Sequence, residues 1–172
     1  FENFTGRVYY AFERENYKHE LFYDPNKPLI FCFDFNSSPG IAVICQEQEL
    51  PGQFEEVQQN GVWLKKPVIG TGVIGEVWIP RNSNTLIVCR RLYEDWQNHK
   101  AEIICYGDAS GGQKKSSGID GSDWDLVKDF FKSTKFSNRI SYCYPRGNPP
   151  VKKRINSMNS RFCSVSGVRR LM

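Results

Sequence analysis

The sequence lacks the patterns that mark membrane-spanning, zinc-binding and ATP-hydrolysing proteins. No stretch approaches the roughly 20 apolar residues that a membrane span needs, and no apolar segment at the start is typical of a signal peptide. None of the six cysteines forms a CxxC pair, so the spacing of a zinc site is absent. The segment GGQKKS at 111–116 does not have the spacing of a GxxxxGK[ST] phosphate-binding loop.

Cysteine and histidine patterns favour packing over chemistry. The two histidines stand alone in the sequence, so no Ser-His-Asp arrangement is indicated. Four of the cysteines lie in apolar, strand-like runs, which is typical of small buried hydrophobic residues in a reducing cytoplasm. These are Cys32, Cys45, Cys105 and Cys143.

Acidic residues are missing from the last quarter of the chain. The last one is Asp129, and ten of the 23 basic residues follow it. The first 129 residues hold the other 13 bases and all 19 acids, so the net charge of +4 conceals an acidic body and a strongly basic end. This asymmetry predicts a surface that faces a polyanion beside a surface that binds cations. A merely solvated basic face is the alternative.

The length of 172 residues fits one domain with a substantial core. Because the chain begins at Phe1 and not at Met, we expect an excised fragment of a longer protein. Residues 1–28 are expected to form a lead-in arm or an edge strand, and residues 29–172 one domain. Asp24-Pro25 and Pro28 separate the two parts.

Hydrophobic periodicity predicts the element order β-β-β-α-β-α-β-α. The polar segment from Gln46 to Lys66 is expected to be a protruding loop or an extended hairpin, with turns at Pro51-Gly52 and Asn60-Gly61. The predicted strands are 29–35, 41–45, 68–79, 102–106 and 139–144. The predicted helices begin near residues 84, 122 and 150 and end near residues 98, 131 and 162.

Each predicted helix has an apolar stripe at helical spacing, which we expect to face the core. Ser83 or Asn84 is expected to cap the first helix, and Ser122 with Asp125 resembles a capping box for the second. The stripes are Leu86, Cys89, Tyr93 and Trp96 in the first helix, Trp124, Val127 and Phe131 in the second, and Val151, Ile155, Met158 and Phe162 in the third.

Two aspartates are the strongest candidates for chemistry. Asp34 interrupts the apolar run LIFCFDF, where an ionised carboxylate is costly unless it is paired or binds a metal. Asp108 ends another strand and precedes a loop of small residues. Carboxylates at the ends of adjacent strands can converge on Mg²⁺, with water and a substrate phosphate completing the coordination. The alternatives are that Asp34 pairs with an arginine or that either aspartate caps a turn.

Four short segments together resemble the nuclease domain of phage large terminase subunits. FCFDFN at 31–36 followed by SSPG is similar to the first metal-binding strand of that family, and YGDASG at 106–111 is similar to its second acidic motif. IGEVWIP at 74–80 followed by SNT at 83–85 fits the segment between them. RINSMNSRF at 154–162 resembles the late helix that precedes the third acidic position. The resemblance covers roughly residues 28–172.

This resemblance implies an α/β, ribonuclease-H-like single domain, with a mixed central sheet flanked by helices. It also implies an endonuclease that cuts double-stranded, concatemeric viral DNA during genome packaging, using two Mg²⁺ or Mn²⁺ ions. Asp34 and Asp108 would be the catalytic metal ligands. The third acidic ligand of the family would fall beyond Met172, which leaves Glu76 as the nearest substitute for the second metal site.

The family further implies partners and a location. The full-length protein would carry an ATPase domain, which is absent from this fragment, and would act with a portal and a small terminase subunit in the host cytoplasm, without a membrane. DNA would be held through its phosphates, without sequence readout. The candidate contacts are Lys114, Lys115, Arg146, Lys152, Lys153 and Arg154.

Two other functions remain open. One is another ribonuclease-H-like nuclease, such as a junction resolvase or an RNA–DNA hybrid nuclease. The other is a non-catalytic DNA-binding or motor-docking domain that has kept the fold. An acidic residue soon after Met172 in a longer chain would favour a nuclease over the binding domain.

Overall fold

The computed structural model describes residues 7–14, 21–35, 38–112 and 121–172. The chain forms two compact units. The sheet unit consists of Tyr23–Gln46 and Ile74–Asn148, and the hairpin unit of Phe1–Phe22, Glu47–Val73 and Pro149–Met172. The domain boundary expected after residue 28 stays a prediction. Among the described residues, no helix is long and apolar enough to cross a membrane.

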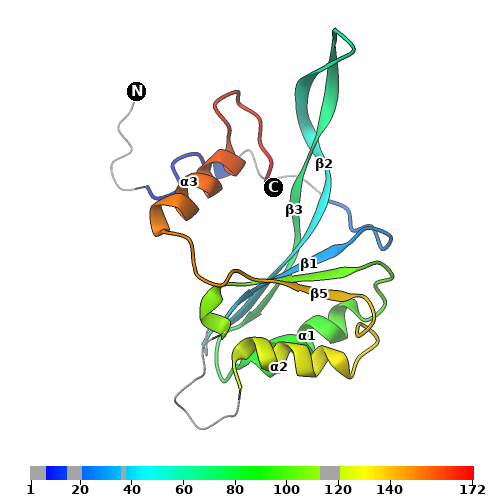
Figure 1. The fold of residues 1–172 in the computed structure, drawn as a ribbon, viewed down its shortest axis with the longest axis vertical. Coiled ribbons are helices and arrows are strands. Elements are labelled where there is room, and N and C mark those ends of the chain that lie inside the picture. Colours follow the sequence, from blue (N-terminus) through cyan, green and yellow to red (C-terminus); the bar gives the residue numbers. More distant parts are fainter. Residues whose placement is uncertain (1–6, 15–20, 36–37, 113–120) are drawn as a thin grey trace. The chain divides into compact units, whose positions relative to one another are not determined.

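The strands form a mixed sheet of five, in the order β3-β2-β1-β4-β5 (Figure 1). β1 is antiparallel to β2 but parallel to β4, and β4 is parallel to β5. The predicted α/β class is therefore confirmed, and the sheet is compatible with a ribonuclease-H-like fold. The strands are β1 (Leu29–Asp34), β2 (Gly40–Gln59), β3 (Val62–Ile79), β4 (Ile103–Tyr106) and β5 (Ile140–Cys143).

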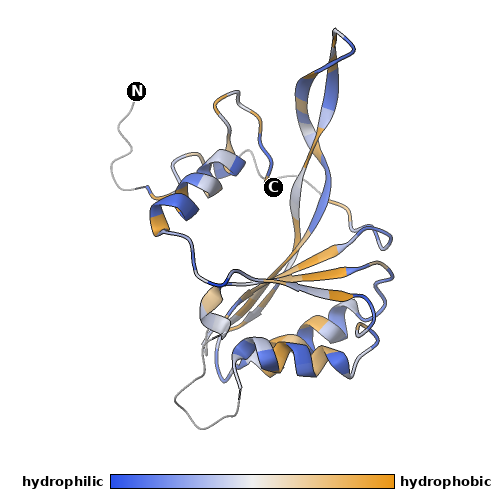
Figure 2. Ribbon diagram, viewed as in Figure 1, coloured by the Kyte–Doolittle hydropathy of each residue, from blue (hydrophilic) through white to orange (hydrophobic). Residues whose placement is uncertain are grey.

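The core of the sheet unit lies between one face of the sheet and two helices, α1 (Thr85–Trp96) and α2 (Asp123–Lys132) (Figure 1). Side chains alternate along β1, so Leu29, Phe31 and Phe33 are buried while the residues between them are more open. Burial of each such side chain contributes roughly 1.5–3 kcal/mol. These apolar side chains determine which side of the sheet the helices cover, and the hydrophobic segments of the strands are coloured orange in Figure 2.

The predicted caps and the stripe of α2 are confirmed. Asn84 caps α1 by accepting the N–H of Ile87, and Ser122 forms a reciprocal capping box with Asp125. The buried face of α2 includes the predicted Trp124, Val127 and Phe131.

The predicted stripe of α1 is partly wrong. The buried residues of α1 are Thr85, Val88, Cys89 and Leu92. Leu86 is instead 40% exposed. The reason is the buried carboxylate of Asp123, which accepts a hydrogen bond from the Thr85 hydroxyl and so turns that polar residue inward.

A buried polar anchor holds the segment that leads into β1. The fully buried side chain of Gln46 accepts the N–H of Asp24 and donates to the carbonyls of Asp24 and Lys27. Close by, the Tyr23 hydroxyl lies 2.9 Å from Nδ1 of the buried His99. The described part of residues 1–28 contains no strand.

In the hairpin unit, β2 and β3 continue as a long two-stranded hairpin (Figure 1), which confirms the extended hairpin predicted for 46–66. Asn60 and Gly61 form its turn, with φ of 52° and 78°. The turn predicted at Pro51-Gly52 is wrong, because both residues lie inside β2. Gly52 has a φ of 69° within this strand, a conformation that glycine adopts without steric cost.

The helix of the hairpin unit, α3 (Val151–Phe162), does not bury the predicted stripe. Val151 is 61% exposed and Met158 is 37% exposed. The buried residue is Asn159, whose side chain accepts the N–H of Ala11 and donates to the carbonyl of Val8. The helix therefore contacts residues 7–14 through this polar contact, which apolar periodicity does not detect. It also contacts them through Phe162 of the predicted stripe, whose ring packs edge-on against the rings of Tyr9 and Phe12.

We predict that the protein loses stability as the pH falls through the ordinary range of histidine. Burial lowers the pKa of His99 below its ordinary value. Below a pH of about 6.5 the unfolded chain therefore binds a proton that the folded chain resists, and the free energy of unfolding declines. Urea unfolding at several pH values between 7.5 and 5.5 measures this decline. In His99→Gln the decline should be smaller; an equal decline in both proteins would contradict the assignment.

Candidate active site

The register of the sheet brings Asp34 and Asp108 to the carboxyl ends of two neighbouring strands. β1 and β4 are adjacent and parallel, and their last paired residues are Cys32 and Tyr106. Asp34 follows Cys32 by two residues and is the last residue of β1. Asp108 follows Tyr106 by two residues, just beyond the end of β4, so both aspartates stand at the same end of the two strands. In α/β proteins, ligands bind beyond the carboxyl ends of parallel strands. The two residues that the sequence analysis ranked highest therefore stand at the same end of neighbouring strands, and their role as ligands stays a prediction.

Asp34 is the last residue of β1 and is exposed, which corrects one step of the sequence argument. Because the alternation of β1 buries Phe33, Asp34 belongs to the face of the sheet opposite α1 and α2. An exposed carboxylate keeps its hydration, so the desolvation cost inferred from its apolar neighbours does not arise. Its case as a ligand rests on its position beside Asp108.

Asp108 is partly engaged by its own loop. Its Oδ1 accepts hydrogen bonds from the N–H groups of Ser110 and Gly111, at 3.0 and 3.3 Å, and from the Ser110 hydroxyl. The Ser110 hydroxyl is the main cause that lowers the pKa of Asp108, and the two N–H groups and the side chain of Asn148 add to it against the effect of burial. The carboxylate is therefore ionised at neutral pH. The expected alternative, that Asp108 caps a turn, is also true.

Contacts from two sides fix the loop that carries Asp108. The indole N–H of Trp124 on α2 donates to the Asp108 carbonyl at 3.1 Å. The Ala109 N–H donates to Oδ1 of Asn148, in the loop after β5, at 2.8 Å. A Cβ at Gly111 would stand 2.4 Å from the ring of Phe35, so only glycine allows this close approach. These contacts hold Asp108 in a defined position.

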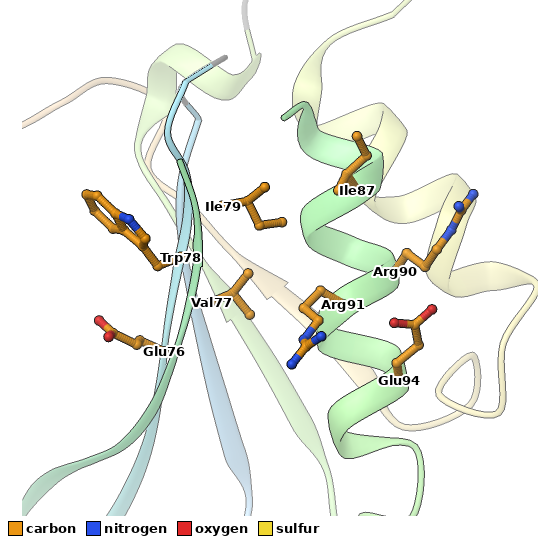
Figure 3. A pocket seen from close by; sticks show the side chains of 8 residues that line it. All are labelled: Glu76, Val77, Trp78, Ile79, Ile87, Arg90, Arg91 and Glu94. Atoms are coloured by element: carbon orange, nitrogen blue, oxygen red, sulfur yellow. The ribbon is translucent and has the colours of Figure 1, made fainter. Parts of the chain in front are cut away.

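Glu76 does not join the two aspartates. It lies on β3, the edge strand, and β2 separates β3 from β1. In Figure 3, Glu76 and Trp78 point to one side of β3, whereas Val77 and Ile79 point towards α1. Across the described parts of the chain, no three His, Cys, Asp or Glu side chains are grouped so that they could hold a metal ion.

Figure 3 also shows a pocket of about 530 Å³ between β3 and α1. Two acids and two bases line it, so their charges balance: Glu76, Glu94, Arg90 and Arg91. Arg91 is paired with Asp95, one turn later on α1, at 2.8 Å. This pocket therefore shows no preference for a polyanion.

The predicted basic contacts fall in three places. Lys114 and Lys115 lie outside the described residues. Arg146 is exposed in the loop after β5 and lines a pocket beside Ser110 and Asn148, at the same edge as Asp108. The other three, Lys152, Lys153 and Arg154, are exposed in the first turn of α3, in the hairpin unit.

Sequence reasoning missed the side chains that support the site. The Ser110 hydroxyl donates to the carboxylate of Asp108, and Asn148 accepts the N–H of the next residue in its loop. Lys128 donates to the hydroxyl of Tyr144 in the loop after β5. The serine two residues after Asp108 was a usable signal, because an Asp-x-Ser segment after a strand favours an Asx-type turn. Asn148 is 40 residues from Asp108 and carries no local signal of this contact.

Comparison with known proteins assigns the chain to no family. No protein-family model matches the chain, and a search of curated proteins finds no match either. The resemblance to terminase nucleases therefore stays a prediction from the four short sequence motifs.

We predict that the capping role of Asp108 can be separated from its charge. Asp108→Ala removes the acceptor of three hydrogen bonds and should lower the free energy of unfolding by about 1 kcal/mol, as loss of a helix cap does. Asp108→Asn retains a side-chain oxygen and should cost less. Urea denaturation compares both with Asp34→Asn at the exposed neighbour. Equal losses in the two Asp108 variants would show that charge, and not the acceptor, stabilises the loop.

Proposed function

We propose that this protein is a metal-dependent endonuclease acting on double-stranded DNA. The observation that carries the proposal is the pair Asp34 and Asp108, the first at the last residue of β1 and the second two residues beyond the end of the adjacent, parallel β4. The mixed sheet and the motif resemblance support the same function. An ionised carboxylate in a fixed loop beside an exposed one suits Mg²⁺, which takes one or two carboxylates and keeps several waters.

In this proposal Asp34 and Asp108 hold the ion, and the loop contacts of Asp108 orient it. Bound Mg²⁺ or Mn²⁺ acidifies a water molecule and neutralises charge on the phosphodiester that is hydrolysed. Ser110 and Asn148 keep the Asp108 carboxylate ionised and in place, as outer partners of metal ligands do. A second ion would need a carboxylate in addition to this pair.

The distribution of charge supports a DNA substrate. All ten bases after Asp129 lie in a part of the chain without acids, and Arg146 stands at the edge of the sheet that carries Asp108. Such residues bind phosphates without reading sequence. By the same resemblance, the substrate would be concatemeric viral DNA in the host cytoplasm. The partners would be an ATPase domain, a portal and a small terminase subunit.

We predict metal-dependent plasmid cleavage that requires both aspartates. The unaltered protein should nick or linearise supercoiled plasmid with Mn²⁺ or Mg²⁺ and not with EDTA. Asp34→Asn and Asp108→Asn should each reduce the rate by more than about 100-fold, since loss of an outer partner alone costs 10- to 100-fold.

Glu76→Gln is the matched control, because Glu76 is an exposed acid on another strand of the same sheet. It should cut at the normal rate. DNA binding that is insensitive to metal, with no cleavage by the unaltered protein, would favour the non-catalytic alternative. Cleavage confined to four-way junctions or RNA–DNA hybrids would favour the other nuclease classes.

We also predict that the first turn of α3 contributes phosphate contacts. Replacing Lys152, Lys153 and Arg154 together by alanine should weaken binding to all duplex sequences. It should reduce the slope of log affinity against log salt by up to about 3, roughly one unit for each lost contact. Fluorescence anisotropy with a labelled duplex at several salt concentrations measures the slope. An unchanged slope would show that these bases form only a solvated face.

A further inference from the structure

A second binding feature lies beside Asp108, in the sheet unit. The loops that follow β4 and β5 enclose a pocket of about 460 Å³. Its wall includes Ser110 next to Asp108, and Tyr144, Arg146 and Asn148 from the other loop. Its volume falls within the roughly 300–1,000 Å³ that small-molecule sites occupy, so it can hold one nucleotide unit. The pocket has one cationic side chain and one aromatic side chain in its wall.

Two side chains, Trp124 and Lys128, hold the ring of Tyr144 in place. Its ring stacks on the buried indole of Trp124, with centroids 4.3 Å apart and planes 15° apart. The ammonium of Lys128 donates to the Tyr144 hydroxyl at 2.7 Å. Trp124 covers one face of the tyrosine ring, and the Lys128 ammonium lies 5.1 Å from the ring centroid. The residue remains 36% exposed and lines the pocket. A ring that is held in this way loses little freedom when a ligand stacks on it.

Arg146 supplies the complementary charge. It is exposed, lines the same pocket, and stands two residues after Tyr144. A guanidinium binds phosphate with two parallel hydrogen bonds. An aromatic face and a guanidinium at one pocket are the two elements with which proteins bind unpaired nucleotides: bases stack on the ring, and the cation follows the backbone.

We propose that this pocket binds one unpaired nucleotide of the DNA, with its base on Tyr144 and its phosphate at Arg146. The proposal rests on the proposed nuclease function for its DNA substrate and names the form of DNA that the site prefers. A base inside an intact duplex presents no free face, whereas a bulged, flipped or single-stranded base does. The pocket adjoins Asp108, so the preference places an unpaired nucleotide next to the phosphate that is cut.

The test measures binding in EDTA, so that it does not depend on cleavage. Two labelled duplexes are compared, one fully paired and one with a single bulged 2-aminopurine. The unaltered protein should bind the bulged duplex more tightly and quench the 2-aminopurine fluorescence as its base stacks. Tyr144→Leu keeps apolar cover on Trp124 but removes the aromatic face. It should reduce the affinity for the bulged duplex by roughly 5- to 150-fold, the range measured for loss of a stacking residue.

Three further variants sharpen the test. Tyr144→Phe retains the aromatic face and should keep the quenching. Arg146→Ala should weaken binding of both duplexes and reduce the dependence of affinity on salt. Tyr10→Ala, at a tyrosine of the hairpin unit that is 62% exposed, is the control and should behave like the unaltered protein.

The outcomes separate this proposal from the proposed function. Equal binding of the two duplexes by the unaltered protein, or a preference that survives in Tyr144→Leu, would overturn the pocket assignment even if the protein cuts plasmid DNA. A preference that depends on Tyr144 would support the pocket even if no plasmid is cut, and the nuclease alone would then be rejected.

Discussion

The indole of Trp124 connects the core of the sheet unit to its candidate site. The ring is fully buried and contacts Phe33 and Phe35 at the end of β1, and Tyr142 and Tyr144 at the end of β5. Its N–H donates to the carbonyl of Asp108. Because one rigid side chain touches the ends of all three parallel strands or their loops, the positions of these loops depend on core packing and not only on loop sequence.

Much of the sheet unit could be predicted from the sequence, because its signals are local and agree with one another. The apolar run of β1, the capping box at Ser122 and the stripe of α2 each specify the same structure at short range. The two aspartates could be chosen because Asp34 interrupts an apolar run and Asp108 ends a predicted strand, and the parallel pairing of β1 and β4 places them at the same end of the sheet. The pairing itself came from the order of elements and not from a local signal.

The remaining features depend on polar contacts between distant residues. Asn159 anchors α3 together with the ring of Phe162, Thr85 is buried because Asp123 faces it, and Asn148 contacts the loop of Asp108. Hydrophobic periodicity does not register such partners, since a buried amide or hydroxyl looks like a surface residue in the sequence. The error at Pro51-Gly52 has another cause: a glycine with positive φ serves a bulge as well as a turn.

The two carboxylates of the candidate site differ in exposure and in the number of hydrogen bonds they accept from their own loop. Asp34 is exposed at a strand end, whereas Asp108 is held by Ser110, Gly111 and the loop of Asn148. The hydrogen bonds that cap the turn also lower the pKa of Asp108, so the same contacts that order the loop keep its carboxylate charged. The capping role that first appeared as the alternative to metal binding is therefore compatible with it, and in the proposed site it would order this residue before the ion binds. A ligand that is already ordered and ionised loses less freedom when a cation arrives, and the exposed Asp34 retains the access to water that hydrolysis needs.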